Sequence, residues 1–291
     1  MKKLDGRVAV VTGGASGIGL ALARALAAEG MKLVIADVEA TALEAATGSL
    51  RDSGAATIGV VTDVSDADSV EALAAATYAE FGACHLLCNN AGVGAPSAKV
   101  WETTVNDWKW VHGVNVMGVV NGILAFVPRM IEAGEEGHVV NTSSGDGGIS
   151  PMPAASVYAA SKAAVSCVTE CLAAQLESEG TALRASIFYP SGGLLRTGLW
   201  TADRNRPAEL AREKPRATKA MTVEDLEAMA KKGGHELKFQ DLDELAQVVV
   251  QGVRDETFVI MIDRESMGPT LRDRAEHLEA GALPAHAGPM G

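Results

Sequence analysis

The sequence predicts an α/β fold, in which a doubly wound, predominantly parallel sheet of seven strands carries helices on both faces. Seven short apolar runs rich in β-branched residues are mostly continuous rather than alternating, which is typical of strands buried on both faces. Stretches rich in Ala, Leu and Glu separate these runs, and such alternation favours parallel strands joined by right-handed crossovers. With 291 residues, 47% of them hydrophobic, the chain is long enough to bury one large core. We predict a single domain over residues 1–263.

The predicted elements follow one another in a regular order. The strands are residues 7–12, 32–36, 57–62, 85–88, 138–141, 184–189 and 258–262, and the helices are residues 18–29, 40–53, 67–81, 105–132, 157–179 and 242–254. Residues 194–234 break the alternation: they are charged, contain Pro207 and Pro215, and show weak helix signals at 207–212 and 223–231. We predict that they form a flap over the crevice at the carboxyl ends of the strands. Residues 264–291 hold few apolar residues and are predicted to be a C-terminal tail.

Charge and hydropathy restrict the partners. A formal net charge of -12 argues against binding to nucleic acid or to anionic lipid, because both need a basic surface. The apolar run in residues 1–14 is too short for the core of a signal peptide. The longest apolar stretch, residues 111–127, contains Asn115 and Asn121 and is shorter than the roughly 20 residues of a membrane span. We therefore expect a cytoplasmic protein with a small-molecule partner, no membrane contact, and a buried helix over 111–127.

The four cysteines raise the question of a metal site. They are spaced as Cys84 and Cys88 and as Cys167 and Cys171. The C-x-x-x-C spacing differs from the C-x-x-C of zinc knuckles, and all four lie in apolar predicted strands or helices. We predict free buried thiols and no metal.

A glycine-rich turn follows the first predicted strand. It reads Thr12-Gly13-Gly14-Ala15-Ser16-Gly17-Ile18-Gly19 and opens directly into a predicted helix. Gly13, Gly17 and Gly19 leave room for a pyrophosphate to reach the backbone at the helix N-terminus, where the amides and the helix dipole attract negative charge. Such turns also occur for steric reasons alone, so the turn by itself leaves both interpretations open.

An acid at the end of the second strand strengthens the dinucleotide interpretation. Asp37 lies about 20 residues after the glycines, where a carboxylate of a Rossmann-type fold accepts the ribose hydroxyls of the adenosine half. It would repel a 2′-phosphate, and neither Val38, Glu39 nor Ser16 supplies a cation that could neutralise one. The sequence therefore predicts NAD rather than NADP. The alternative is that Asp37 only caps the next helix.

Several separated motifs resemble the short-chain dehydrogenase/reductase family over residues 5–200. The glycine turn is similar to T-G-x-x-x-G-x-G, Asn89-Asn90-Ala91-Gly92 to N-N-A-G, and Tyr158 and Lys162 to Y-x-x-x-K. Asn115 and Ser144 stand where the family has its catalytic asparagine and serine, and Asp63-Val64 where it has a pair against adenine. The resemblance implies a dinucleotide-binding catalytic domain with catalytic residues Asn115, Ser144, Tyr158 and Lys162. It implies cofactor-binding residues Gly13, Ser16, Gly17, Ile18, Gly19, Asp37, Asp63, Val64, Asn90, Ala91, Gly92, Tyr158 and Lys162.

Two positions depart from the family pattern. Ser144 lies one residue further from Tyr158 than the family spacing, which implies an insertion within residues 145–157. We assign Ser144 rather than Ser143, because the second serine of the family's pair is the catalytic one. Residues 190–197 are longer than the family's P-G-x-V-x-T, which leaves open whether Thr197 contacts the nicotinamide amide.

The catalytic residues have complementary chemistry. Tyr158 and Lys162 lie one helical turn apart, so their side chains share a face, and an ammonium beside a phenol favours phenolate. We therefore expect the pKa of Tyr158 to fall below its ordinary value near 10, which suits a general acid/base. Ser144 can donate a hydrogen bond to the substrate oxygen. The resemblance implies that Lys162 also binds the nicotinamide ribose and that Asn115 holds a water that links Lys162 to solvent.

The predicted reaction is hydride transfer between NAD(H) and a secondary alcohol or its ketone. The substrate walls should come from residues 146–155, 191–196 and the flap. An apolar or aromatic substrate is favoured by Met152, Leu194, Leu195 and Trp200. An anionic substrate is favoured by Arg196, Arg204 and Arg206. The alternatives are a non-catalytic NAD-binding regulator and an S-adenosylmethionine-dependent methyltransferase, for which Tyr158 and Lys162 would have no use. The resemblance further implies a homodimer or homotetramer assembled through the helices at 105–132 and 157–179.

Overall fold

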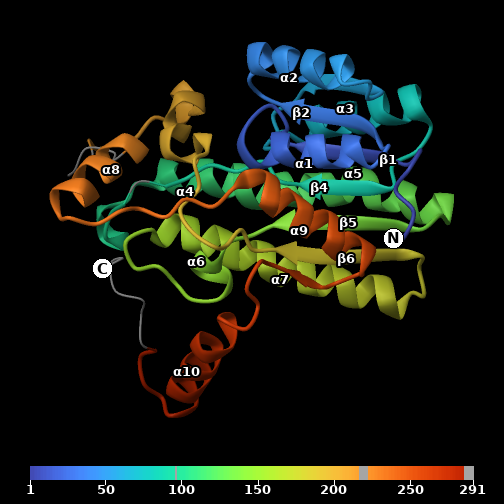
Figure 1. The fold of residues 1–291 in the computed structure, drawn as a ribbon. Coiled ribbons are helices and arrows are strands. Elements are labelled where there is room, and N and C mark those ends of the chain that lie inside the picture. The colour runs from blue at the N-terminus through green and yellow to red at the C-terminus, as the bar shows by residue number, and fades with distance from the viewer. Residues whose placement is uncertain (96, 216–221, 285–291) are drawn as a thin grey trace.

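The protein is built on a seven-stranded parallel sheet (Figure 1). The computed structural model describes residues 1–95, 97–215 and 222–284. The strands are β1 (Val8–Thr12), β2 (Lys32–Asp37), β3 (Thr57–Val61), β4 (Leu86–Asn89), β5 (Gly137–Thr142), β6 (Leu183–Phe188) and β7 (Val259–Ile260). Their order is β3-β2-β1-β4-β5-β6-β7, and each neighbouring pair is parallel. The predicted fold class is confirmed, and the order reverses between β1 and β4, where doubly wound sheets bind ligands.

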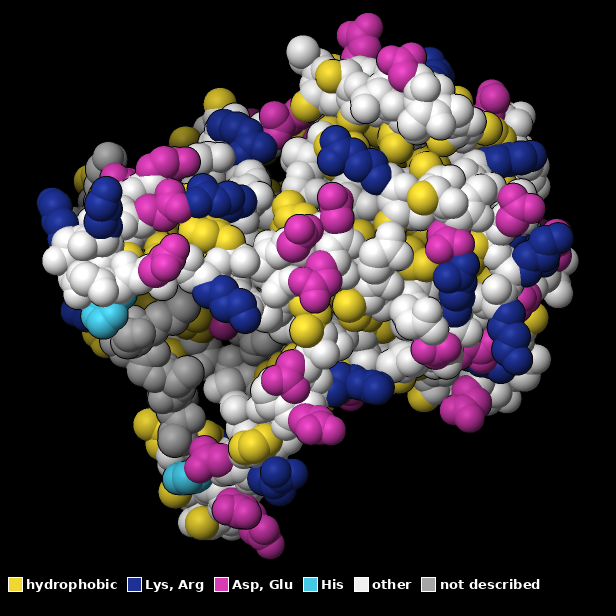
Figure 2. Space-filling view, in the orientation of Figure 1, with side chains coloured by type: hydrophobic (Ala, Val, Ile, Leu, Met, Phe, Trp, Pro, Cys, Tyr) yellow, Lys and Arg dark blue, Asp and Glu magenta, His cyan; other side chains and the backbone are white. Residues whose placement is uncertain are grey.

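The predicted flap contains short helices. They are η3 (Gly198–Asn205), η4 (Ala208–Leu210) and α8 (Val223–Lys232). The last two lie close to the two weak helix signals of the sequence, whereas η3 was not predicted. Part of the predicted tail is also helical: α10 (Met267–Glu279) projects from the body of the molecule (Figures 1 and 2). Residues 216–221 of the flap and 285–291 of the tail lie outside the described residues. Lys and Arg side chains are interspersed with Asp and Glu over the face drawn in Figure 2.

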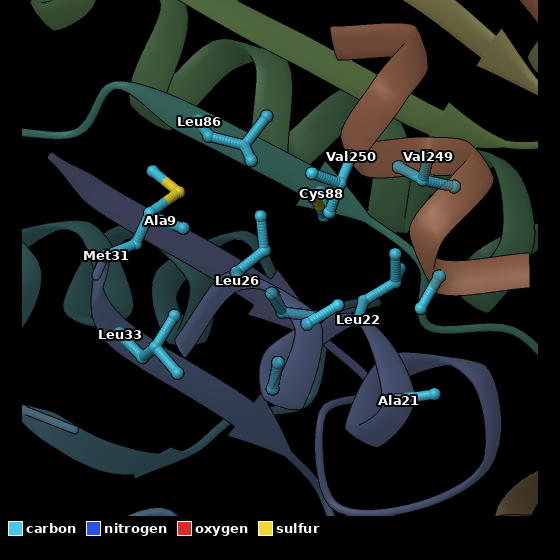
Figure 3. Packing of buried hydrophobic residues seen from close by; sticks show 14 of the residues in the cluster. Ala9, Ala21, Leu22, Leu26, Met31, Leu33, Leu86, Cys88, Val249 and Val250 are labelled. Carbon is cyan, nitrogen blue, oxygen red and sulfur yellow. The ribbon is translucent and has the colours of Figure 1, made fainter. Parts of the chain in front are cut away.

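Helices cover both faces of the sheet, and each layer has its own buried cluster. On one face lie α1 (Gly17–Ala28), α2 (Ala40–Asp52) and α9 (Leu242–Arg254); on the other lie α3 (Ala67–Phe81), α5 (Gly118–Ala133) and α7 (Ser156–Ser178). Figure 3 shows Leu22 and Leu26 of α1 in the same buried cluster as Leu86 of β4 and Val250 of α9. Because α1 begins at the glycine turn, this packing fixes the turn relative to the sheet. Two shorter helices, η1 (Val100–Glu102) and α6 (Gly145–Gly148), follow β4 and β5.

The helix predicted over residues 105–132 is interrupted. It consists of α4 (Val105–His112), one π-helical turn (Gly113–Met117) and α5. By length and composition alone, residues 105–133 could cross a membrane, since an 18-residue window has a mean hydropathy of 1.6. Half of that window is buried, and α5 packs against β4 and α3, as in a core helix.

The cysteine prediction is half wrong. Cys84 and Cys88 are buried, but Cys167 and Cys171 are exposed on α7. The two exposed residues are four apart, so they share one helical face, and on α7 that face points away from the sheet. Among the described residues, no three His, Cys, Asp or Glu side chains are grouped in a way that could hold a metal ion.

Candidate active site

A cavity of about 1920 Å³ opens at the carboxyl ends of the strands. Every residue that the sequence predicts to bind the cofactor lines it, as does Ser144. These residues are Gly13, Ser16, Gly17, Ile18, Gly19, Asp37, Asp63, Val64, Asn90, Ala91, Gly92, Tyr158 and Lys162. Asn115 is fully buried behind the wall. The fold therefore brings the separated motifs together, because parallel strands end at the same edge of a sheet.

The glycine turn is held open by its neighbours. A Cβ on Gly19 would lie 2.0 Å from the Gly13 carbonyl oxygen, so only glycine fits there. The Thr12 hydroxyl accepts hydrogen bonds from the backbone amides of Asn90 and Ala91, at 3.0 and 3.1 Å. The Asn90 side chain in turn donates to the Thr12 carbonyl at 3.0 Å. These hydrogen bonds hold the glycine turn against the loop after β4, and the backbone amides at the start of α1 remain available for a pyrophosphate.

Asp37 lies at the end of β2, facing the glycine turn. One carboxylate oxygen accepts a hydrogen bond from the Ala15 amide and the other from the Glu39 amide, both at 3.1 Å. Asp37 thus contacts the backbone that leads into α2, but the N-cap position itself is Glu39, whose side chain makes no capping hydrogen bond. Each carboxylate oxygen of Asp37 keeps a lone pair for a ribose hydroxyl.

Tyr158, Lys162 and Ser144 meet at the cavity wall. Ser144 and Tyr158 line the same cavity, and the Lys162 Nζ lies 5.7 Å from the centre of the Tyr158 ring. Lys162 is buried, and its Nζ donates to the Thr142 carbonyl at 2.8 Å. Ser143 instead points into α7, where its hydroxyl donates to the Lys162 carbonyl at 2.8 Å. The hydroxyl of Ser143 is thus already engaged within α7, and Ser144 stays the predicted catalytic serine.

Asn115 joins three segments from the π-helical turn. Its Oδ1 accepts from the Val93 amide at 2.8 Å, and its Nδ2 donates to the Val93 carbonyl and to the Ser161 hydroxyl. A Cβ on Gly92 would lie 3.3 Å from the Asn115 Oδ1 and 3.6 Å from the Lys162 Nζ, so these two polar atoms approach the same glycine. Asn115 fixes the loop after β4 against the helix of the Tyr-Lys pair.

Comparison with known proteins now identifies the family. Residues 7–207 match the family described as short chain dehydrogenase. The chain belongs to that family.

Among relatives of this short-chain dehydrogenase is the C alpha-dehydrogenase of a Sphingobium species, 35% identical over 262 residues, which are 90% of this chain and 82% of the relative. A short-chain dehydrogenase/reductase from Burkholderia phymatum, solved in complex with NAD, is 38% identical, with a TM-score of 0.88 and full coverage of both chains. A metagenomic short-chain oxidoreductase, solved with NADP, is 31% identical with a TM-score of 0.61, over 66% of this chain and 85% of the other.

The pKa of Tyr158 differs from the expectation. Burial raises it to about 12, the hydrogen bond from Ser144 opposes this rise, and the carboxylate of Asp146 adds to it. Burial also lowers the pKa of Lys162, to about 8. The prediction of a lowered tyrosine pKa is wrong for the cofactor-free dehydrogenase, because withdrawing the phenolate from water outweighs an ammonium that is itself poorly solvated. At neutral pH Tyr158 is therefore protonated and can donate a proton.

The substrate end of the cavity is apolar. Met152, Leu194, Leu195 and Trp200 line it as predicted. The sequence did not single out further lining residues from α4, η3, α8 and the region after β7, namely Trp110, Leu199, Leu226, Met229, Met261 and Met267. No local motif marks these positions, since only the folded chain brings α4, the flap and the segment after β7 together at the crevice.

The three arginines that favoured an anionic substrate each have an acidic partner. Arg196 pairs with Glu227, and its guanidinium stacks 4.0 Å from the centre of the Phe239 ring. Arg204 lies 2.5 Å from Glu39, and Arg206 lies 2.7 Å from the buried Asp107. Each guanidinium thus already has a carboxylate partner, and of the three only Arg204 is among the described residues that line the cavity, so they give little support to an anionic substrate.

Proposed function

We propose that this short-chain dehydrogenase transfers hydride between NAD(H) and the carbon of a secondary alcohol or its ketone. The observation that carries the proposal is that Ser144, Tyr158 and the buried Lys162 line the wall of one cavity together with the predicted cofactor-binding residues. Two hydroxyl groups on the same cavity wall can both reach one substrate oxygen. That is the arrangement which a carbonyl needs when it accepts hydride.

Each residue has a distinct part in this reaction. The nicotinamide, when bound, supplies or accepts the hydride. Tyr158 donates its proton to the carbonyl oxygen during reduction and removes the hydroxyl proton during oxidation. Ser144 donates a hydrogen bond to the same oxygen and stabilises the charge that develops there. Lys162 would hold the cofactor ribose, and Asn115, whose two side-chain donors are taken up by Val93 and Ser161, positions the loop after β4 beside it.

The proposed preference for NAD rests on Asp37. Its carboxylate repels a 2′-phosphate and can accept the two ribose hydroxyls instead. The NAD complex of the Burkholderia phymatum protein supports this choice, whereas the NADP complex of the metagenomic enzyme indicates that relatives differ in cofactor.

We propose an apolar or aromatic secondary alcohol as the substrate. The methionine, leucine and tryptophan side chains that line the cavity support this class. Family membership removes the methyltransferase alternative. The regulator alternative would leave the Ser144, Tyr158 and Lys162 arrangement without a purpose.

A homodimer or homotetramer is part of the proposal. Met117, Leu124 and Ile131 are exposed at intervals of seven residues, at and along α5, and therefore form one apolar stripe. Cys167 and Cys171 are exposed on α7, the other helix predicted to take part in assembly. Light scattering tests this proposal, because a 30.1 kDa particle at micromolar concentration would contradict it.

The function is tested by absorbance at 340 nm with a panel of aromatic, alicyclic and acidic secondary alcohols and with NAD or NADP. We expect turnover with NAD on apolar alcohols and a loss of roughly 10²- to 10⁴-fold in Tyr158→Phe, with NADH affinity retained. Tyr78→Phe is the matched control, since it removes a buried phenol hydroxyl on α3 that does not line the cavity. Equal activity of both variants would contradict the assigned role of Tyr158. Tight NADH binding without turnover on any alcohol would favour the regulator.

A further inference from the structure

We propose that Glu39 is a second determinant of cofactor choice: it neutralises Arg204, a cation that the flap carries to the ribose end of the site, and thereby withholds it from the 2′-phosphate of NADP. The inference rests on the proposed NAD-dependent function and deepens it. Among the residues after β2, the sequence offers no cation to an incoming phosphate. The fold brings one from 165 residues further along the chain.

The ion pair lies next to the ribose-binding acid. The Arg204 guanidinium is 2.5 Å from the Glu39 carboxylate, and the Asn205 amide donates to the same oxygen at 2.8 Å. The Glu39 backbone amide donates to Asp37 at 3.1 Å. All four residues line the same cavity, and Arg204 is the one arginine among its described lining residues.

Arg204 does not depend on Glu39 for its position. Its Nη1 atom donates to the Gly198 carbonyl at 2.9 Å and to the Thr201 carbonyl and hydroxyl, both at 3.0 Å. These acceptors belong to η3, the same turn that carries Arg204. Neutralising Glu39 would therefore leave the guanidinium in place without the negative charge that now opposes it.

The flap segment is also anchored immediately after Arg204. Arg206 and Arg212 lie 2.7 and 2.8 Å from the carboxylate of Asp107 on α4, which is fully buried. Because this anchor is independent of Glu39, loss of the Glu39 carboxylate should not release the flap. The charge next to Asp37 would change, while the backbone that presents Arg204 would stay.

The balance of charge explains the consequence for NADP. Hydrogen bonds from Arg204 and Asn205 hold the pKa of Glu39 below its ordinary value, so the side chain is ionised at neutral pH. A bound 2′-phosphate would then face two carboxylates, those of Asp37 and Glu39, but only one guanidinium, which already pairs with Glu39. Arginine beside this position is the usual partner of a 2′-phosphate in folds of this kind, and it pairs with phosphate through two parallel hydrogen bonds.

The test is calorimetric titration of NADH and NADPH into wild-type protein, Glu39→Gln, Arg204→Gln and the double variant. We expect Glu39→Gln to tighten NADPH binding about tenfold, with NADH affinity changed less than about threefold. Arg204→Gln alone should weaken NADPH binding further, and in the double variant it should abolish the gain. Glu71→Gln is the matched control: it removes one negative charge from an exposed pair with Arg129, outside the cavity, and should leave both affinities unchanged.

The outcomes separate this inference from the proposed function. Unchanged NADPH affinity in Glu39→Gln, or a gain that survives the loss of Arg204, would overturn the role of Glu39 while normal NADH binding upheld the function. Failure of the wild-type protein to bind either cofactor would overturn the function itself. If Glu39→Gln unfolds, Arg204→Gln still tests the inference. Unchanged NADPH affinity in Arg204→Gln would contradict a role of the Glu39–Arg204 ion pair in cofactor choice.

Discussion

Removal of the buried carboxylate of Asp107 should destabilise the whole fold. Asp107 accepts hydrogen bonds from Arg206 at 2.7 Å and from the Thr104 amide at 2.9 Å, and Arg212 lies 2.8 Å from it. The side chains of the two arginines are only 7% and 12% exposed. In Asp107→Asn both guanidinium groups keep their charge but lose the one carboxylate that pairs with them among the described residues. Breaking a buried pair in this way costs about 3–5 kcal/mol.

At about 2 °C per kcal/mol for a chain of this length, the midpoint of thermal unfolding should fall by roughly 6–10 °C. Differential scanning calorimetry measures it, with Glu71→Gln as the control, because an exposed pair contributes at most about 1 kcal/mol. Burial would raise the pKa of Asp107, but hydrogen bonds from Arg206 and Thr104 lower it overall. Its contribution is therefore present above its ordinary pKa, near 4, and is lost as the pH falls through the lower folded value. Equal midpoints for the two variants at pH 7 would refute this reasoning.

Three further predictions concern the site and the assembly. Asp146→Asn should lower the pKa of Tyr158, since the Asp146 charge helps to raise it, and should move the pH profile of alcohol oxidation to lower pH; an unmoved profile would count against this coupling. Gly19→Ala should abolish NADH binding, because its Cβ would lie 2.0 Å from the Gly13 carbonyl oxygen; near-normal affinity in a titration would contradict this. Leu124→Glu places a charge on the exposed stripe of α5 and should yield monomers in light scattering, whereas an unchanged mass would move the interface elsewhere.

The sheet and the cofactor end of the cavity were predictable because both follow from local patterns. Continuous apolar runs mark buried parallel strands, and the ends of those strands meet at one edge. The glycine turn, Asp37 and Asn90 each follow a strand directly, so their convergence required no knowledge of long-range packing.

What the sequence could not supply depends on contacts between distant segments. Arg204 reaches Glu39 only through the folded flap, and nothing near Glu39 in the sequence signals it. Cys167 resembles a core residue in composition, but its burial depends on which side of α7 faces the sheet. The pKa of Tyr158 depends on how much water the surrounding walls exclude, a property that helical spacing to Lys162 does not contain.

The π-helical turn at Gly113–Met117 sets the rotation of α4 relative to α5 about their common axis. An α-helix advances about 100° per residue, so the widened turn rotates the side chains of α4 relative to those of α5. Trp110 of α4 packs in the cluster beneath the flap, and Phe126 of α5 packs against the sheet. In an unbroken α-helix these two rings would be turned about 160° from each other, and the wider turn reduces this angle. Deleting a single residue of the turn should restore an unbroken α-helix with both rings on their present faces, at the expense of the irregular turn that carries Asn115. The irregular turn thus fixes the angle between Trp110, which lines the cavity wall, and Phe126, which packs in the core.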